Sequence, residues 1–492
     1  MWRVVTQNCV KIDIPSISRP IKKKLHIAMF PWLAFGHMIP FLELAKLIAQ
    51  KGQHISFIST PRNIDRLPKL TPNSMARFLQ DSHPDWLLYD FAPYWLPSIA
   101  RKLGISNAFF NIVIAAFLSF VGSKAHLGER KNLEDFTVPP TWVLFPTTVT
   151  MRFFEVMKIF QGGISSNKSN VSDIFRVVEM LNGCDIVDVC VSELVHLFSL
   201  NGITIRFGLV LLNERRFMGL CSYILEHIEF DFEISWCVCI VSMLWLILNF
   251  LGLCLILNFL VPEWLGVLED LHRKPVLPVG QLPTIVYDNG DETETWLWMK
   301  DWLDKQAKGS VVYVAFGSKA KPSQEELTEI ALGLEQSKLP FFLVLRTRHG
   351  QADTELIELP KGFEERTKGQ GLVSHDSIGG FFTHSRWSSV VEALQFERAL
   401  ILLTFYADQG INAKVLEDKH IGYLIPRNEQ DGSFTRDSMA KSLRLVIVEE
   451  EGKIYRDKAK EIKALFGDRT SQDRYLDSFL DYLISHSKNI CS

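Results

Sequence analysis

Residues 25–59 read LHIAMFPWLAFGHMIPFLELAKLIAQKGQHISFIS, and this stretch decides the fold class. Leu25 to Phe30 is a short apolar run, which is typical of a buried parallel strand. After a predicted turn over Pro31 to His37, apolar side chains recur at helical spacing from Ile39 to Ile48, and His54 to Ser59 is the next predicted strand. A strand, a helix and a strand in this order form the repeating unit of a doubly wound α/β domain.

The same pattern starts again near Gly309, in the second half of the chain. The predicted elements there are the strands Ser310 to Phe316, Phe341 to Leu345 and Ala399 to Thr404, and the helices Gln324 to Gln336 (with Ser323 as N-cap), Trp387 to Leu394 and Ile411 to Glu417. Two α/β lobes therefore bracket a less regular middle. We expect them to face a shared cleft, with ligands at the carboxyl ends of the strands.

Six parts are predicted along the chain. They are an N-terminal extension (1–24), an N-terminal lobe (25–193), an atypical insertion (194–261), the end of that lobe with an interlobe linker (262–290), a C-terminal lobe (291–460) and a helical tail (461–492). The extension is basic and lacks clear periodicity, so we expect folding to start at Leu25.

Composition excludes several classes of protein. Of the 492 residues 47% are apolar and 22% charged, as in an ordinary soluble enzyme, and a net charge of −3 argues against a nucleic-acid partner. The eight cysteines form no CxxC pair and no apolar run precedes Lys22, so we expect reduced thiols and a cytoplasmic protein. GxGxxG, P-loop, HExxH and EF-hand motifs are absent, so no dinucleotide, metal or other cofactor is predicted.

Residues 236–261 carry no charged side chain and are long enough to span a bilayer. Three interpretations remain open: a segment foreign to the fold such as translated intron sequence, which we favour, a membrane-anchoring helix, or a buried core helix. A true membrane span would put the two lobes on opposite sides. A membrane partner is therefore expected only if this segment is genuine.

His37 and Asp90 are the first candidate site residues. His37 follows the first strand at the mouth of the sheet, and Asp90 ends the apolar strand Trp86 to Tyr89. A carboxylate bonded to one imidazole nitrogen fixes the tautomer and strengthens the other nitrogen as a base. A lone histidine is more often structural, so the pair by itself is a weak signal.

A second candidate site lies between His375 and Gln409. Gly379 and Gly380 allow close backbone approach, and a helix is predicted to begin beside His384. Free N–H groups and the positive end of a helix favour phosphate. The candidate ligands for a phosphate and a sugar are His384, Trp387, Ser388, Ser389, Glu392, Asp408 and Gln409.

These residues carry a family resemblance. Residues 381–392 (FFTHSRWSSVVE) and 407–409 (ADQ) resemble the glycosyltransferase box of plant UDP-dependent glycosyltransferases. Residues 25–40 resemble the opening strand and catalytic histidine of the same enzymes. Residues 85–97 (DWLLYDFAPYWLP) and 425–434 (IPRNEQDGSF) look like the group that includes rhamnosyltransferases and other enzymes that add sugar to a glycoside.

The resemblance implies a GT-B fold and an inverting transfer from a UDP-sugar, which is a co-substrate, to a small-molecule glycoside such as a flavonoid or triterpenoid. It implies that His37 is the general base and that Asp90 orients it. It implies further that Ser318, His384 and Ser389 contact the diphosphate, that Glu392 contacts the ribose, and that Trp387, Ser388, Asp408 and Gln409 contact the donor. The sugar is glucose or rhamnose. No metal is implied, and a monomer is expected.

Two departures from the family affect the donor site. The tryptophan that opens the family box is missing before His375, and base stacking is worth roughly 1–3 kcal/mol per base. Arg386 stands where the family has glycine. Its charge would favour phosphate, but its bulk and its loss of φ freedom would oppose close approach. The alternatives are therefore an impaired or inactive relative of these enzymes, or a membrane-anchored interaction protein.

Overall fold

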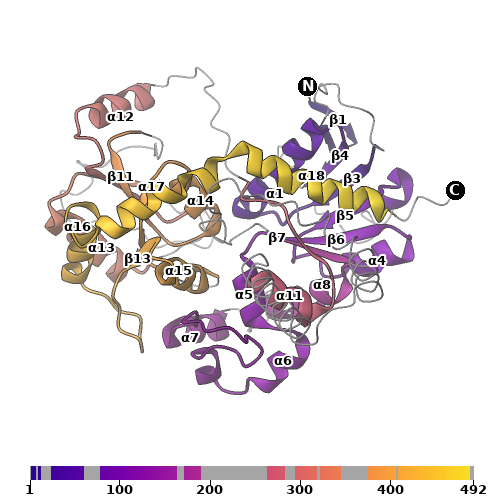
Figure 1. Ribbon diagram of the computed structural model, residues 1–492, viewed down its shortest axis with the longest axis horizontal. Coiled ribbons are helices and arrows are strands. Elements are labelled where there is room, and N and C mark those ends of the chain that lie inside the picture. The colour runs from indigo at the N-terminus through magenta and orange to yellow at the C-terminus, as the bar shows by residue number, and fades with distance from the viewer. Residues whose placement is uncertain are drawn as a thin grey trace, which may run out of the picture. The chain divides into compact units, whose positions relative to one another are not determined.

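The computed structural model describes residues 2–6, 9–12, 24–59, 78–162, 171–189, 263–282, 294–317, 322–344, 375–405 and 408–487 (Figure 1). The chain separates into two units, residues 1–192 with 264–492 and residues 193–263. The predicted insertion, 194–261, lies outside the described residues, as does its apolar segment 236–261. Among the helices that are described, none is long and apolar enough to cross a membrane.

The N-terminal lobe is built on an eight-stranded sheet of order β1-β2-β4-β3-β5-β6-β7-β8. Strands β3 to β8 run parallel to one another. Every residue of β5, β6 and β7 is buried, as in a parallel sheet covered on both faces. Of the three, only β5 is a continuous apolar run, because β6 carries Ser106, Asn107 and Asn111 and β7 carries Asp188. The strands are β1 (Trp2–Thr6), β2 (Cys9–Ile12), β3 (His26–Phe30), β4 (His54–Ile58), β5 (Trp86–Tyr89), β6 (Ser106–Asn111), β7 (Ile186–Val189) and β8 (Val276–Pro278).

Strands β1 and β2 correct the prediction that folding starts at Leu25. They form an antiparallel hairpin, and β2 pairs antiparallel with β4 at the edge of the sheet. An added edge strand is held by backbone hydrogen bonds. For that reason it does not require the apolar periodicity that the sequence lacks here.

The first predicted strand–helix–strand unit is confirmed as β3, α1 (Phe35–Gln50) and β4. The helix begins at Phe35, however. His37 therefore lies in its first turn, whereas the sequence predicted that it lies in the loop before the helix. The N-cap residue, Ala34, provides no side-chain hydrogen bond. The start of the helix therefore leaves no capping signal in the sequence.

Seven further helical segments are described between β5 and β8. They are α4 (Leu96–Lys102), α5 (Ala115–Val121), α6 (Lys124–Glu129), η1 (Leu133–Phe136), α7 (Phe153–Gly162), α8 (Asp173–Gly183) and α11 (Glu263–His272).

The C-terminal lobe contains a parallel five-stranded sheet of order β10-β9-β11-β12-β13. Its strands are β9 (Val311–Ala315), β10 (Phe341–Val344), β11 (Ile378–Thr383), β12 (Ala399–Leu402) and β13 (Gly422–Leu424), and its helices are α12 (Glu294–Asp304), α13 (Gln324–Ser337), α14 (Trp387–Gln395), α15 (Gln409–Asp418), α16 (Arg436–Ile447) and α17 (Lys453–Gly467). The predicted N-cap at Ser323 is confirmed, since it forms a capping box with Glu326. Buried side chains of the sheet, α13 and α16 form one core.

The tail is two helices, and the predicted boundary between residues 460 and 461 falls inside the first, α17. Helix α17 packs on α14 and β12, whereas α18 (Arg469–Ser485) packs on α1 and β8 of the other lobe (Figure 1). The Trp86 indole donates to the carbonyl of Leu483 at 2.9 Å. The C-terminal helix thus returns to the N-terminal sheet.

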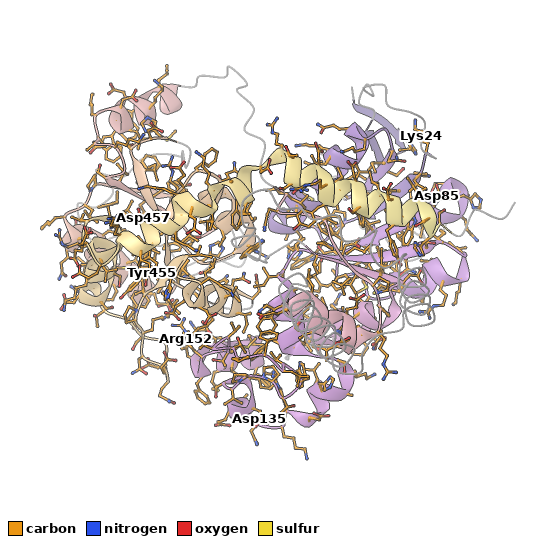
Figure 2. The ribbon with its side chains drawn as sticks, in the orientation of Figure 1. Lys24, Asp85, Asp135, Arg152, Tyr455 and Asp457 are labelled. Carbon is orange, nitrogen blue, oxygen red and sulfur yellow. The ribbon has the colours of Figure 1, made fainter. Side chains whose placement is uncertain are left out.

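A buried ion pair beside α7 also reaches the C-terminal lobe; Figure 2 labels Arg152, one of its members. Arg152 Nη2 lies 2.9 Å from Glu155 Oε1, and both side chains are buried. The guanidinium donates to Thr404 Oγ1 at 2.6 Å, and that hydroxyl donates to Glu155 Oε1 at 2.6 Å. A Cβ on Gly410 would lie 2.3 Å from Glu155 Oε2, so only glycine fits there. The network therefore joins the N-terminal lobe to both flanks of the loop that carries Asp408.

We predict that Glu155→Ala lowers the free energy of unfolding by about 3–5 kcal/mol, because it leaves the Arg152 charge buried without a carboxylate. The matched control is Lys463→Ala, which breaks an exposed pair with Glu397 and costs less than about 1 kcal/mol. Urea titrations of both variants measure the two losses. Losses of equal size would contradict the role given to the buried pair.

Candidate active site

His37 and Asp90 form a buried pair at the carboxyl ends of β3 and β5. His37 Nδ1 lies 2.8 Å from Asp90 Oδ2, and the two residues are 6% and 2% exposed. The backbone N–H of Trp32 donates to the same oxygen, and that of Phe91 donates to Oδ1. The carboxylate is thus held by three donors. Because Nδ1–H faces it, the second imidazole nitrogen, Nε2, carries the lone pair.

A cavity of about 480 Å³ adjoins this pair. Its lining is mostly apolar, with Trp32 and Phe91 packed against the imidazole at ring-centroid distances of 4.7 and 5.6 Å. The other lining side chains come from α5, α6, η1, α7, α8, the end of β6 and the loops that follow β6 and precede α7, and they include Ile112, Val113, Phe117, Phe120, Phe136, Met151, Ile159 and Val177. Asp408 and Gln409 of the C-terminal lobe also line it. The cavity can therefore hold an apolar molecule with a hydroxyl at His37.

His384 is buried between β11 and α14. Its burial, and after it the positive charge of Arg386, lower the pKa of His384 to about 3. The imidazole is therefore neutral and has one N–H to donate. A Cβ on Gly317, at φ +66, would lie 3.0 Å from this ring, so the turn after β9 needs glycine both for its backbone and for space.

Helix α14 presents its first turn toward the cleft. Ser388 is exposed and Ser389 half-buried, whereas Trp387 is buried and its indole donates to Gln281 Oε1 at 3.3 Å. Burial raises the pKa of Glu392, one turn farther along. The hydroxyls of the two serines are thus the groups most open to a ligand.

Asp408 and Gln409 begin helix α15 and are both buried. Asn412 donates to Asp408 Oδ2 at 2.9 Å, and the same amide donates to the carbonyl of Ser385. Gln409 Oε1 accepts the backbone N–H of Phe405 at 2.8 Å. The Asn412 amide therefore ties the loop before α14 to the start of α15.

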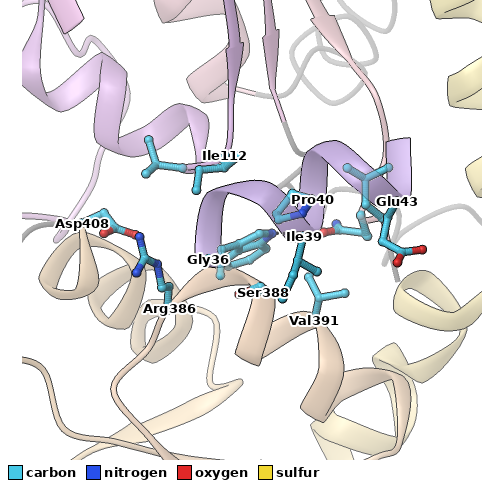
Figure 3. A pocket seen from close by; sticks show the side chains of 13 residues that line it. Gly36, Ile39, Pro40, Glu43, Ile112, Arg386, Ser388, Val391 and Asp408 are labelled. Atoms are coloured by element: carbon cyan, nitrogen blue, oxygen red, sulfur yellow. Dashed lines mark hydrogen bonds between the residues drawn. The ribbon is translucent and has the colours of Figure 1, made fainter. Parts of the chain in front are cut away.

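Arg386 reaches across to the other lobe. Its Nη2 lies 3.2 Å from His37 Nε2, and in Figure 3 its side chain extends toward the first turn of α1 with Asp408 beside it. The backbone of Arg386 has φ −71 and ψ 135, so the expected loss of φ freedom is wrong. The positive φ, 66°, is at Ser385 instead. Because the arginine side chain leaves the helix end, its bulk lies in the cleft and not over the backbone.

The structure brings most of the predicted residues together. His37, Asp90, Asp408 and Gln409 line the large cavity, and Trp387, Ser388 and Asp408 line a smaller one of about 30 Å³ beside Gly36 (Figure 3). His384 follows β11, and Ser389 and Glu392 lie on α14 close by. Ser318 and the missing box opening before His375 lie outside the described residues.

Three contacts were not predicted from the sequence. Asn412 lies four positions after Asp408, so the i, i+4 rule for helices would have paired them. The contacts of Gln281 with Trp387 and of Arg386 with His37 join residues 106 and 349 positions apart. No local sequence pattern predicts contacts between residues so far apart.

Comparisons with known proteins agree with this geometry. The family of UDP-glucoronosyl and UDP-glucosyl transferases matches residues 280–486. UDP-glycosyltransferase 91A1 of Arabidopsis thaliana is 42% identical over 94% of this chain and 97% of its own length. The chain belongs to the plant UDP-glycosyltransferase family. The resemblance drawn from the sequence is thereby confirmed, and the chain is an enzyme of the transferase class.

Two other findings place the chain within this family of UDP-glycosyltransferases. Soyasaponin III rhamnosyltransferase of Glycine max is 31% identical, with 94% of this chain and 96% of that protein covered. The solved structure of apo UGT2 from Phytolacca americana, at 20% identity, matches with a TM-score of 0.62 over 93% of this chain and 99% of its own. The predicted GT-B fold of two Rossmann-like lobes is confirmed.

We predict that His384→Gln makes this UDP-glycosyltransferase less sensitive to acid. His384 stays neutral in the folded chain down to about pH 3, whereas it takes up a proton near pH 6.5 once unfolded. Stability is therefore complete above pH 6.5 and falls as the pH drops from there toward 3, by up to about 1.4 kcal/mol per pH unit.

Urea titrations between pH 4.5 and 7.5 measure this slope. His272, whose pKa burial lowers to about 4, stays in both chains and provides a residual slope. Identical slopes in the two proteins would show that His384 does not lose its charge on folding.

Proposed function

We propose that the chain transfers glucose or rhamnose, with inversion, from a UDP-sugar to a hydroxyl of a small-molecule glycoside such as a flavonoid or triterpenoid. The observation that carries this proposal is the His37–Asp90 pair at the end of an apolar cavity of about 480 Å³. The names of two relatives support a glycoside acceptor. These are soyasaponin III rhamnosyltransferase, at 31% identity, and anthocyanidin-3-O-glucoside rhamnosyltransferase of Petunia hybrida, at 27%.

In this mechanism the acceptor hydroxyl gives its proton to His37 Nε2 as its oxygen attacks the anomeric carbon. The new C–O bond forms while the bond to UDP breaks, and UDP leaves with the electron pair. Asp90 keeps the Nδ1–H in place and stabilises the imidazolium that forms. The short Nδ1–Oδ2 distance, and the two backbone donors that fix the carboxylate, support this role.

The donor is proposed to lie against the C-terminal lobe. His384 and Ser389, with Ser318, would hold the diphosphate at the N-terminus of α14, where backbone N–H groups and the helix dipole favour anions. Glu392 would bind the ribose, and Trp387, Ser388, Asp408 and Gln409 the sugar. Preorganised donors of this kind stabilise a departing diphosphate, so we propose that no metal or other cofactor is needed.

We also propose that the enzyme is a cytoplasmic monomer that binds no nucleic acid. Cys184 is a buried free thiol, as suits a reducing compartment. A membrane contact belongs to this proposal only if residues 236–261 are genuine.

A second candidate function rests on Arg386. Its guanidinium contacts His37 Nε2, which is the nitrogen that the mechanism requires as the base. A chain in which this contact is permanent would bind UDP-sugar without transferring the sugar.

We predict that the wild-type chain binds UDP with a dissociation constant between about 1 µM and a few mM, and that Glu392→Ala weakens binding by about tenfold or more. A lost hydrogen bond to a charged group is worth roughly 1.5–3 kcal/mol. Titration calorimetry measures both constants. The matched control is Glu461→Ala, whose carboxylate pairs with Lys458 on the exposed face of α17. A folded wild-type chain that does not bind UDP would show that the chain shares only the ancestry of these enzymes.

We predict that His37→Ala lowers kcat by about 10² to 10⁴, the usual contribution of a general base. UDP affinity should not fall, because the imidazole faces the acceptor cavity. The assay is UDP release with a panel of flavonoid and triterpenoid glycosides, run in EDTA so that metal independence is tested as well. A His37→Ala enzyme with wild-type kcat would rule His37 out as the base, and activity lost in EDTA would refute metal independence.

A further inference from the structure

Arg386 is in contact with the nitrogen that must accept the proton. Its Nη2 lies 3.2 Å from His37 Nε2, while His37 Nδ1 is bonded to Asp90. A guanidinium has donors only, so Nε2 is the acceptor in this contact. The lone pair that would take the acceptor proton is therefore already in use.

The surroundings of Arg386 favour an anion over an imidazole as its partner. Arg386 is the N-cap of α14 and reaches the first turn of α1, and neither helix has an acidic residue in its first turn. Both positive helix ends thus point to a place that already holds a cation. The carboxylate of Asp408 lines the same cavities, and the hydrogen bond it accepts there comes from Asn412. Within the described residues Arg386 forms no ion pair, and guanidinium binds phosphate in a bidentate geometry that neutral imidazole cannot provide.

Gly36 provides the space for this contact. A Cβ at Gly36 would lie 3.2 Å from Arg386 Nη1 and 3.3 Å from Cζ. Such distances are tighter than ordinary contacts, so alanine at this position would displace the guanidinium and weaken its contact with His37. The charge of the arginine would remain.

We propose that Arg386 is a cap on the catalytic base that the donor removes. With the donor site empty, its guanidinium holds His37 Nε2; when a UDP-sugar binds, the guanidinium turns to the diphosphate and leaves Nε2 free for the acceptor hydroxyl. The donor then has to bind before the acceptor can react. This inference rests on the function proposed above, because it needs a diphosphate at the start of α14.

The test is the rate at which diethyl pyrocarbonate modifies His37, followed by mass spectrometry of its peptide with and without UDP. The exposed His420 serves as the internal reference for the reagent. Without UDP, we expect Arg386→Gly to speed modification of His37 by about tenfold, since a hydrogen bond with one charged partner is worth about that factor. Gly36→Ala should also speed it, and Arg474→Ala on the exposed face of α18 should not.

Saturating UDP is expected to speed modification of His37 in the wild-type chain and to leave the rate in Arg386→Gly unchanged or lower. Equal rates in the wild type and Arg386→Gly without UDP would overturn the cap. If Arg386→Gly reacts faster but UDP does not change the wild-type rate, the cap is permanent and its removal by the donor is refuted. Calorimetry with UDP tells these results apart from failure of the proposed function. If the proposed function fails, calorimetry detects no binding of UDP to the folded wild-type chain. In that case removal by the donor fails as well, and the rates without UDP still decide the cap.

Discussion

Parallel pairing of β3 with β5 is the constraint on which the site depends. Phe30 is in register with Tyr89, so the two strands end at the same level, and the backbone N–H of Asp90 donates to the carbonyl of Phe30. The pairing alone therefore brings together the residues that follow these strands. His37 enters from the first turn of α1 and Asp90 from the loop after β5, and a hydrogen bond of 2.8 Å joins them. Trp32, from the loop between, adds a backbone donor that fixes the carboxylate.

The second lobe is held against this site by contacts that are mostly remote from the chemistry. Helix α18 leaves the C-terminal lobe and packs on α1, where Lys51 pairs with Asp473 and Asp477. On another side, Arg152 and Glu155 of the N-terminal lobe bond to Thr404. Glu155 also packs against Gly410 at the start of α15 and so brings a carboxylate to its positive end. The residues that carry Asp408 and Gln409 are therefore positioned by both lobes.

Substitutions in the family box act differently from what their chemistry suggests in isolation. Arginine in place of glycine at position 386 introduces no backbone strain, because the positive φ belongs to Ser385. The long side chain instead crosses the cleft and joins the C-terminal lobe to His37. A substitution that looks like damage to a phosphate loop is thus a contact between the two lobes.

The sequence by itself determined the α/β class, the strands and helices near His37 and near His384, the family, and the residue types at the site. These are local properties of the sequence. Apolar runs indicate buried strands, and 3.6-residue periodicity indicates α13 and α14. The capping box of Ser323 indicates where α13 begins. Only the tertiary structure decided where α1 starts, since Ala34 gives no cap, and that an edge hairpin precedes Leu25. It alone also decided that Arg386 lies on His37. Those outcomes depend on backbone pairing and on contacts between residues hundreds of positions apart, which no local pattern records.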